Sequence, residues 1–378
     1  MVTPAQRRNR NPAQVTLFLS GDVMTGRGID QVLPHPSDPR LHEQYVDSAL
    51  EYVALAENAN GTIPRPAGFS YIWGDALNEL ERFEPDARII NLETSITTNE
   101  DYELKGINYR MHPANTPCLA EARIDCCVLA NNHVLDWGSR GLIETLNTLQ
   151  AAGLKTAGAG PNLSEALRPA IHQIGPFRLL IFGAATEDSG VPPHWAATAI
   201  RPGVALLPDL SAESARSFDL LVHAVKRSGD IIVLSIHWGG NWGYEIPPEQ
   251  RDFARRLIDL GAADVIHGHS SHHPKAIEVY KQKLILYGCG DFLNDYEGIS
   301  GYEEYRSNLV LMYFVTLDAA AAKLCTVAMV PLQMKRFRLV RAAASDADWL
   351  RETLNCKAGE TGTEVIAGPE NTLQVHAV

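Results

Sequence analysis

The sequence of 378 residues has few cysteines, no long apolar run and a shortage of positive charge. Its six cysteines include no CxxC pair and no regular spacing, which argues against a zinc knot and a disulfide framework. No apolar run approaches the roughly 20 residues that a membrane-spanning helix needs. The formal net charge is −12, from 33 Lys and Arg against 45 Asp and Glu. Such a chain is not expected to bind nucleic acid or an anionic membrane surface as its main partner.

With 45% hydrophobic residues, the chain is long and apolar enough to bury a full core. No repeat or long linker divides it, so we expect one domain over residues 15–340, followed by a C-terminal helix and a peripheral tail over residues 341–378. The apolar stretch Val15–Leu19 is too short for the core of a signal peptide. A cytoplasmic protein with reduced cysteines and no membrane anchor is therefore expected.

Short apolar segments rich in β-branched residues alternate with helical patterns, which predicts an α/β fold with parallel βαβ units. The predicted strands are Val15–Ser20, Arg88–Leu92, Cys126–Ala130, Arg178–Ala184, Ile231–Ile236, Asp264–Ile266 and Leu284–Tyr287. Cys126 and Cys127 should point to opposite faces of their strand. The predicted helices are Leu41–Asn58, one capped by Ser139 and closing at Gly153, Glu213–Ser228, one between Pro247 and Gly261, and Asp346–Cys356. Leu309–Leu317 and Leu324–Leu332 should pair as a hairpin.

Polar residues of metal-ligand type follow five of these strands. They are Asp22, Glu93, Asn132 with His133, His237, and the cluster His267, His269, His272 and His273. Ligands bind at the carboxyl ends of strands in open α/β sheets, so we expect these side chains to meet. Asp, Glu, Asn and neutral His together suit Mn, Fe or Zn better than Ca or Mg. One or two divalent ions would polarise a substrate oxygen or acidify bound water, which makes hydrolysis the default expectation.

Each residue taken alone also has a structural interpretation. Asp22 could cap a turn, Glu93 could pair with an arginine, and Asn132 could satisfy backbone groups of a tight loop. The tryptophans near the candidate ligands, Trp137, Trp238 and Trp242, could form an apolar substrate wall or simply pack against the sheet ends. The acidic residues Asp295, Glu297, Glu303 and Glu304 are interpreted as a solvated loop.

Six motifs, taken in order, are shared with a known family. They are Gly21–Arg27 (GDVMTGR), Asn91–Thr94 (NLET), Ala130–Gly138 (ANNHVLDWG), His237–Gly239 (HWG), Asp264–His269 (DVIHGH) and Tyr287–Phe292 (YGCGDF). Between about Val15 and Val340 the chain resembles the CapA family of poly-γ-glutamate capsule biosynthesis proteins, a branch of the calcineurin-like metallophosphoesterases. The resemblance implies a four-layer α/β/β/α sandwich, in which two mixed sheets pack face to face between helices and the site lies at strand carboxyl ends.

The resemblance also implies roles for individual residues. The implied metal ligands are Asp22, Glu93, Asn132, His237, His269 and His272. His133 resembles the general acid that protonates a leaving oxygen, with Asp136 as its orienting partner. Replacing His269 is expected to abolish both metal binding and turnover, so His269 counts as catalytic as well. His267 is expected to be a strand residue or a neighbour of the ligands, and His273 merely to adjoin Pro274.

Two departures from the phosphoesterase pattern bear on function. The superfamily opens with Asp-x-His, whereas Met24 stands at the third position here, and the closing Gly-His-x-His is stretched to Gly-His-Ser-Ser-His, as in the CapA branch. We expect a metal-dependent hydrolase acting on a phosphoester or on a γ-glutamyl or peptide substrate, linked to poly-γ-glutamate. Two alternatives remain: a peptide epimerase that abstracts an α-proton with metal assistance, and a non-catalytic metal-binding component of a polymer-synthesis assembly. The substrate would be a small molecule, a peptide or polyglutamate.

Overall fold

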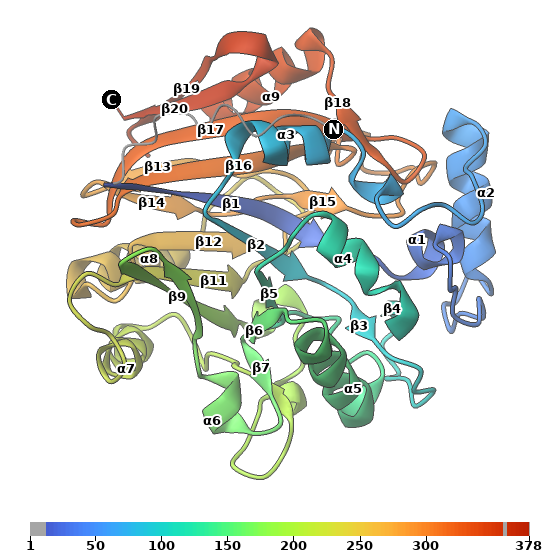
Figure 1. Ribbon diagram of the computed structural model, residues 1–378, viewed down its shortest axis with the longest axis horizontal. Coiled ribbons are helices and arrows are strands. Elements are labelled where there is room, and N and C mark those ends of the chain that lie inside the picture. The colour runs from blue at the N-terminus through green and yellow to red at the C-terminus, as the bar shows by residue number, and fades with distance from the viewer. Residues whose placement is uncertain (1–12, 358–360, 378) are drawn as a thin grey trace.

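The computed structural model describes residues 13–357 and 361–377, which form a mixed α/β structure built on two mixed sheets (Figure 1). The larger sheet has the order β19 (Thr363–Ala367), β20 (Leu373–Ala377), β17 (Lys323–Met334), β16 (Leu309–Asp318), β1 (Gln14–Val23), β2 (Ala87–Leu92), β5 (Cys126–Val128) and β6 (Lys155–Ala157), with β15 (Asp291–Leu293) beside β1 and β18 (Leu339–Arg341) beside β17. The smaller has the order β13 (Ile277–Tyr280), β14 (Lys283–Leu286), β12 (Val265–His269), β11 (Ile231–His237), β9 (Phe177–Ala185) and β8 (Ala170–Ile174).

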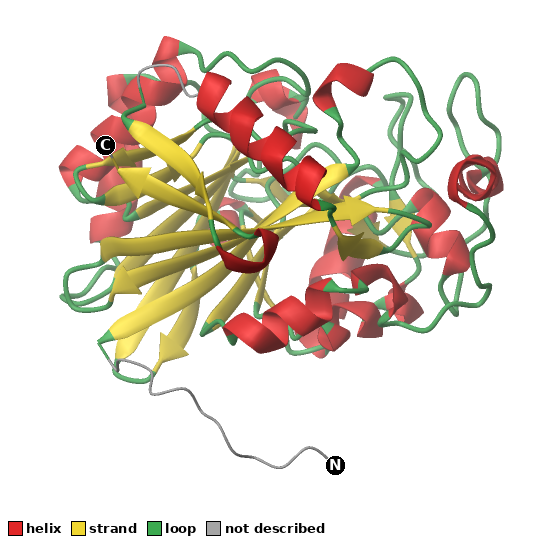
Figure 2. Ribbon diagram, turned by 90° about the horizontal axis from the view of Figure 1, so that it is seen from above, coloured by secondary structure: helices red, strands yellow, loops and turns green. Residues whose placement is uncertain are grey.

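Helices surround these strands (Figure 2). They are α1 (Arg27–Val32), α2 (Ala49–Asn60), α3 (Ala76–Phe83), α4 (Pro117–Glu121), α5 (Gly138–Ala151), α6 (Leu163–Ala166), α7 (Ala212–His223), α8 (Pro248–Leu260) and α9 (Ala344–Lys357). Two short strand pairs complete the described structure, β3 (Ser95–Ile96) with β4 (Arg110–Met111), and β7 (Ala159–Gly160) with β10 (Gly203–Val204). No helix in the described part of the chain is long and apolar enough to cross a membrane.

Alternating apolar side chains hold the two sheets together. In β1, Leu17 and Leu19 lie in one buried cluster with Val233 of β11, whereas Phe18 lies in a second cluster on the other face. The same alternation places Leu234 of β11 in a third cluster with side chains of α7 and α8. Because strand side chains alternate between faces, each central strand is buried on both sides.

The parallel strands place their carboxyl ends along one edge of each sheet. β1 runs parallel to β2, which continues parallel to β5 and β6, and in the smaller sheet β9, β11, β12 and β14 are parallel. Figure 1 shows β1 and β12 pointing the same way, although they belong to different sheets. The carboxyl ends of the parallel strands of both sheets therefore lie on one side of the molecule.

The seven predicted strands and the predicted hairpin are all present, with ends shifted by a few residues. Cys126 and Cys127 are both buried and lie in different core clusters, which confirms their predicted opposite orientation. The helix that closes at Gly153 was predicted to be capped by Ser139, but it begins at Gly138 and has no side-chain cap. The sequence pattern predicted the helix itself but not how its first turn begins.

Two further helices are shorter than predicted. The helix expected over Leu41–Asn58 begins only at Ala49, because Ser48 adopts an extended conformation, accepts a hydrogen bond from the Leu50 amide and forms a bridge with Arg40. The helix expected over Glu213–Ser228 ends at His223.

The carboxyl-terminal segment differs most from its prediction. Instead of a peripheral tail, the described residues after Lys357 supply β19 and β20, which pair with each other and, through β20, with β17. Val365 and Leu373 are 4% and 2% exposed and join the cluster between the sheets. The Gly- and Thr-rich composition of this segment obscures its short alternation of apolar residues, which are buried once β20 pairs with β17.

Candidate metal centre

The two sheets meet at the carboxyl ends of β1 and β12. Nε2 of His267 lies 2.7 Å from the carbonyl oxygen of Ser20, and the Ser270 amide donates to Oδ2 of Asp22 at 3.2 Å. Gly21 is required here, because a Cβ at this position would lie 1.6 Å from the Gly290 carbonyl oxygen. The absent side chain lets β15 approach β1 beside Asp22.

Three of the predicted ligands form a compact buried group. One ligand atom each from Asp22, His237 and His269 lies within 4.8 Å of the other two, and this is the one group of three or more such side chains found in the described residues. His237 and His269 are register partners on β11 and β12, with their Nδ1 atoms 2.8 Å apart. His269 Nδ1 also lies 3.8 Å from Oδ1 of Asp22. A carboxylate and two imidazoles are suitable donors for a divalent transition metal.

A chain of hydrogen bonds through His267 and Ser235 determines which nitrogen of His269 carries a proton. The Ser20 carbonyl can only accept a hydrogen bond, so His267 donates to it from Nε2. Burial lowers the pKa of His267 to about 4, so its ring is neutral and its Nδ1 offers a lone pair. Ser235 Oγ, 3.0 Å away, then donates to that lone pair and accepts from Nε2 of His269 at 2.9 Å. His269 therefore presents an unprotonated Nδ1 to Asp22 and His237. His267 supports the ligands, as expected, rather than joining them.

Glu93 lies at the other side of His237. Its Oε1 is 4.0 Å from Nε2 of His237 and 3.8 Å from Nε2 of His133. Asn91, which the sequence did not single out as a site residue, donates from Nδ2 to Oδ1 of Asp22 at 2.8 Å and lies 3.5 Å from Oε2 of Glu93. The interpretation that Glu93 pairs with an arginine finds no such ion pair in the described residues.

Burial and mutual repulsion outweigh the favourable partners of the two carboxyls, Asp22 and Glu93. Burial, together with the charge of Asp291, raises the pKa of Asp22 to about 7, and burial with the charges of Asp22 and Asp291 raises the pKa of Glu93 well above its ordinary value. Burial also lowers the pKa values of His237 and His269 well below the ordinary value of histidine. Neutral imidazoles beside repelling carboxyls are the electrostatic setting that a divalent cation would stabilise.

Asn132 follows β5 and meets the same edge. Its Oδ1 is buried and has no hydrogen-bond partner, which an oxygen ligand awaiting a cation would show. The structural role considered for Asn132 belongs to its neighbour Asn131, whose Nδ2 donates to Asn91 Oδ1 at 3.0 Å and to the Leu92 carbonyl at 2.9 Å. Asp22, His237 and His269, whose donor atoms lie together, thus fit a metal ion, and Glu93 borders this group at His237.

His133 and Asp136 form the pair that the motif suggests. Nδ1 of His133 lies 2.6 Å from Oδ2 of Asp136, which also accepts from the Tyr109 amide at 2.6 Å. Lys105, which the sequence analysis missed, pairs with Oδ1 of Asp136 at 2.8 Å and donates to the Asn132 carbonyl. Burial and the nearby Lys105 charge lower the pKa of His133 to about 4, against the opposing effect of Asp136. Lys105 lies in an irregular loop, so no spacing pattern marked it.

His272 is not part of the compact group. Its Nδ1 lies 2.8 Å from Oδ1 of Asp291, a residue quoted within the last motif but not predicted as a site residue. Burial lowers the pKa of His272, but the Asp291 carboxylate raises it more, so the net shift is upward. His273 adjoins Pro274, as expected, and stacks on Tyr305 with ring centroids 4.6 Å apart.

The tryptophans divide between the two interpretations. Trp238 is 2% exposed and stacks on Tyr287, so it packs in the core. Trp137 is 4% exposed and lies beneath the guanidinium of Arg110. Trp242 borders a candidate site residue through its side chain, with its ring 5.2 Å from that of His272.

The acidic residues interpreted as a solvated loop are only partly solvated. Asp295 is 1% exposed and accepts from Nη2 and Nε of Arg27 at 2.6 and 3.1 Å. Glu297 is buried and accepts from the Phe337 amide at 2.6 Å. Glu303 and Glu304 are exposed, as expected. The interpretation was wrong for the first two because their partners are distant in sequence.

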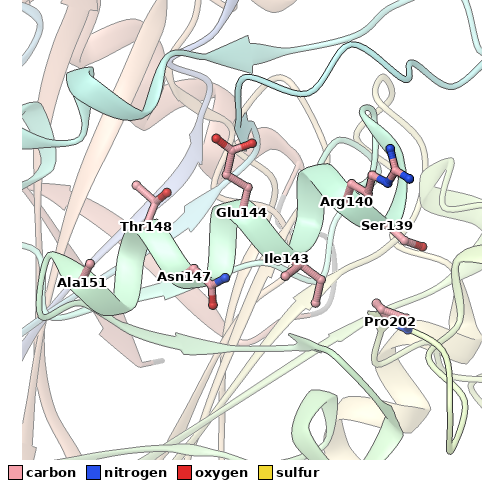
Figure 3. A pocket seen from close by; sticks show the side chains of 8 residues that line it. All are labelled: Ser139, Arg140, Ile143, Glu144, Asn147, Thr148, Ala151 and Pro202. Atoms are coloured by element: carbon pink, nitrogen blue, oxygen red, sulfur yellow. The ribbon is translucent and has the colours of Figure 1, made fainter.

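A surface groove lies away from this centre. It has a volume of about 590 Å³ and runs along α5, with Pro202 opposite the helix (Figure 3). Its lining residues are Ser139, Arg140, Ile143, Glu144, Asn147, Thr148, Ala151 and Pro202. The Glu144 carboxylate already accepts from Thr97 and Thr98. The groove has no group of metal-binding side chains.

Known proteins are similar in sequence to most of this chain, including the region of the candidate site. A family model described as bacterial capsule synthesis protein PGA_cap matches residues 16–296, which include every candidate ligand. A probable polyglutamine synthesis accessory protein of Mycobacterium tuberculosis is 48% identical over 368 residues, 97% of each chain. The PGA biosynthesis protein CapA of Bacillus subtilis is 27% identical over 296 residues, 78% of this chain and 66% of that protein. The capsule biosynthesis protein CapA of Bacillus anthracis is 24% identical over 325 residues, 83% and 67%.

Proposed function

Because the chain belongs to the PGA_cap family of bacterial capsule synthesis proteins, we propose that it is a metal-dependent hydrolase acting on a phosphoester or on a γ-glutamyl bond, in a process linked to poly-γ-glutamate. The observation that carries the proposal is the buried group of Asp22, His237 and His269, whose donor atoms lie within 4.8 Å of one another. The names of the relatives support the link to the polymer. The two sheets and the outer helices would correspond to the four-layer metallophosphoesterase sandwich.

Asp22, Glu93, Asn132, His237 and His269 would hold the metal, with His272 as the remaining predicted ligand. A divalent Mn, Fe or Zn ion bound there supplies Lewis acidity toward a substrate oxygen or water. The chain's own residues supply the rest. The Ser235 relay keeps Nδ1 of His269 unprotonated, and His133, oriented by Asp136, holds or moves a proton at Nε2.

Metal-dependent product release tests this proposal. The purified full chain, loaded with Mn²⁺ or stripped with a chelator, would be incubated with p-nitrophenyl phosphate and separately with poly-γ-glutamate. We expect release of p-nitrophenol, or of new amino ends, only in the metal-loaded samples. Equal release with and without metal would contradict the proposal.

One observation favours the epimerase alternative. Met24 stands where a phosphoesterase has a histidine, and its Sδ accepts from the Tyr296 hydroxyl at 3.4 Å instead of facing a metal. A thioether is a poor ligand for Mn²⁺ or Zn²⁺, and a site with one metal suits proton abstraction next to a carbonyl. Incubation with a peptide in deuterium oxide separates the two. Deuterium at an α-carbon without chain cleavage would support epimerisation.

A non-catalytic role in polymer synthesis is the third candidate. It is favoured by the name of the mycobacterial relative, which describes an accessory protein. Tight binding of both Mn²⁺ and poly-γ-glutamate, with no chemical change in either the polymer or p-nitrophenyl phosphate, would support it.

A further inference from the structure

A second surface pocket carries aromatic rings and charges of both signs. It has a volume of about 470 Å³ and is formed by the loop after β11, the segment before β16 and helix α9. Its aromatic and charged lining residues are Tyr244, Glu304, Tyr305, Trp349, Glu352 and Lys357, all of them exposed or half-buried. We propose that this pocket binds a free α-amino acid group, with ammonium and carboxylate on one carbon, and so holds the amino end of a γ-linked glutamyl chain.

A run of aromatic rings connects this pocket with the metal centre. The ring centroid of Trp242 lies 5.2 Å from that of His272 and 5.1 Å from that of Tyr305, which lines the pocket. Tyr305 also stacks on His273, the neighbour of His272, at 4.6 Å. Two ring contacts therefore separate the pocket wall from a residue at the edge of the centre. One unit of a γ-linked glutamyl chain spans about 6 Å through its five backbone bonds, so one or two units would cover this distance.

The rings and carboxylates of the pocket fit an ammonium group. The ring centroids of Tyr244 and Tyr305 lie 5.5 Å apart, and aromatic faces attract cations. In the described part of the chain, Glu304 has no ion-pair partner, and the one such partner of Glu352 is its neighbour Arg351 at 3.4 Å. An ammonium group between these carboxylates and ring faces would gain both kinds of interaction.

Lys357 supplies the complementary charge. It lines the same pocket, with its Nζ 5.2 Å from the ring centroid of Tyr244, and has no ion pair among the described residues. A ligand with only positive charge would meet Lys357, and one with only negative charge would meet Glu304 and Glu352. The mixture of charges therefore favours a group that is itself a zwitterion.

Only one position of a γ-linked glutamyl chain has this pair of charges. Each γ bond joins a side-chain carbonyl to the α-nitrogen of the next residue, so every residue after the first has lost its ammonium. The first residue keeps an ammonium and a carboxylate on its α-carbon. Internal residues carry one carboxylate and the last residue carries two, which the glutamates of the pocket would repel. The pocket would thus distinguish the amino end from the rest of the chain.

The inference rests on the proposed hydrolase function at a γ-glutamyl bond, and it fixes where cleavage would occur. With the first residue in the pocket, the bond that reaches the metal centre is one or two units away. Water adds its hydroxyl to the γ-carbonyl carbon and its remaining proton to the released nitrogen. Each cleavage therefore yields one short fragment and a new amino end, which can enter the pocket in turn.

Binding without metal tests the pocket independently of catalysis. The full chain, stripped of metal with a chelator, would be titrated calorimetrically with γ-linked triglutamate and with its N-acetylated form, which lacks the ammonium. We expect the acetylated form to bind about 10-fold more weakly, and Glu304→Gln and Lys357→Met each to raise the Kd of the free form by a similar factor.

The matched controls are Glu51→Gln and Lys323→Met, at exposed positions outside the pocket, and they should bind as the unaltered chain does. Equal affinity of the unaltered protein for the free and acetylated forms, or binding of neither, would overturn the inference. This comparison does not depend on any variant folding.

Product analysis separates the inference from the proposed function. The Mn²⁺-loaded protein would be incubated with poly-γ-glutamate, with either a free or an acetylated amino end, and the products sized by mass spectrometry over time. We expect fragments of one short length from the free polymer and none from the acetylated one. Internal fragments of many lengths would overturn the inference and leave the hydrolase function standing. No product from either polymer or from p-nitrophenyl phosphate would contradict the proposed function, and the binding comparison would still decide the role of the pocket.

Discussion

Ser235 Oγ lies 2.9 Å from Nε2 of His269, and this bond decides which nitrogen of the histidine can bind a metal. Ser235 also donates to Nδ1 of His267, and His267 donates from Nε2 to the Ser20 carbonyl. The positions of the protons on His267, Ser235 and His269 therefore follow from this one backbone acceptor. Neighbours that orient a ligand typically change metal affinity by about 10–100-fold when removed. The serine is thus as much a part of the centre as the residues that would touch the ion.

Ser235→Ala should weaken metal binding without unfolding the protein. The change removes the acceptor of His269 Nε2–H, so the imidazole can adopt the other tautomer and present a proton to the cluster. We expect the Kd for Mn²⁺ to rise by about 10–100-fold, measured by calorimetric titration. Ser214→Ala, which alters a buried serine on α7, is the control and should bind as the unaltered chain does. Equal affinity in both variants would show that the relay does not set the tautomer.

Lys105→Met should lower turnover while leaving the metal in place. Lys105 holds Asp136 and the Asn132 carbonyl, and through Asp136 it orients His133. We expect kcat to fall by about 10–100-fold, in line with other residues that orient a reacting group, with unchanged metal content.

The matched control for Lys105 is Lys281→Met, which removes a surface ion pair with Asp259. Its kcat should match that of the unaltered chain. If Lys105→Met also kept full turnover, the orienting role of the lysine would be excluded.

The metal-free protein should show the raised pKa of Asp22 in its stability. Burial raises that pKa from 3.8 to about 7, so between these values the folded chain holds a proton that the unfolded chain has lost. The stabilising contribution of the protonated carboxyl is present at low pH and is lost as pH rises toward 7. Asp22→Asn removes this dependence, because an amide stays neutral.

Chemical unfolding at pH 5 and at pH 8, in the presence of chelator, measures the effect. As the pH rises from 5 to 8, the free energy of unfolding of Asp22→Asn should increase relative to that of the unaltered protein. Each pH unit by which the folded and unfolded pKa values differ corresponds to about 1.4 kcal/mol, so the gain is at most a few kcal/mol. Any cost of the amide facing the Ser270 N–H is the same at both pH values. Asp101→Asn, at an exposed carboxyl, should show no such difference, and a parallel pH course for all three proteins would refute the assignment.

Arg27→Met should destabilise the fold strongly. Arg27 is 4% exposed and pairs with Asp295 at 2.6 Å and with Glu43 at 2.9 Å. Removing the cation leaves two buried carboxylates uncompensated, which typically costs about 3–5 kcal/mol. Arg65→Met, which breaks an exposed pair with Glu57, should cost about 1 kcal/mol or less. Denaturant unfolding of both variants compares them directly, and equal losses would be inconsistent with a buried network.

The sequence predicted the parts of the site that follow strands. Asp22, His237 and His269 lie at the ends of β-branched apolar runs, and the parallel strands bring these three side chains together. Two residues were missed, Lys105 in an irregular loop and Asp291 at the start of the short strand β15, because no periodic pattern marks either position. The buried Arg27–Asp295 pair was misread for the same reason: its partners are 268 positions apart.

The metal content of the purified chain tests the central claim most directly. Elemental analysis of the unaltered protein, compared with His269→Ala prepared in the same way, counts ions per chain. The proposed centre predicts one or two equivalents of a divalent transition metal in the unaltered protein and a loss of that metal, together with turnover, in His269→Ala. Full activity of His269→Ala in a metal-free preparation would contradict it.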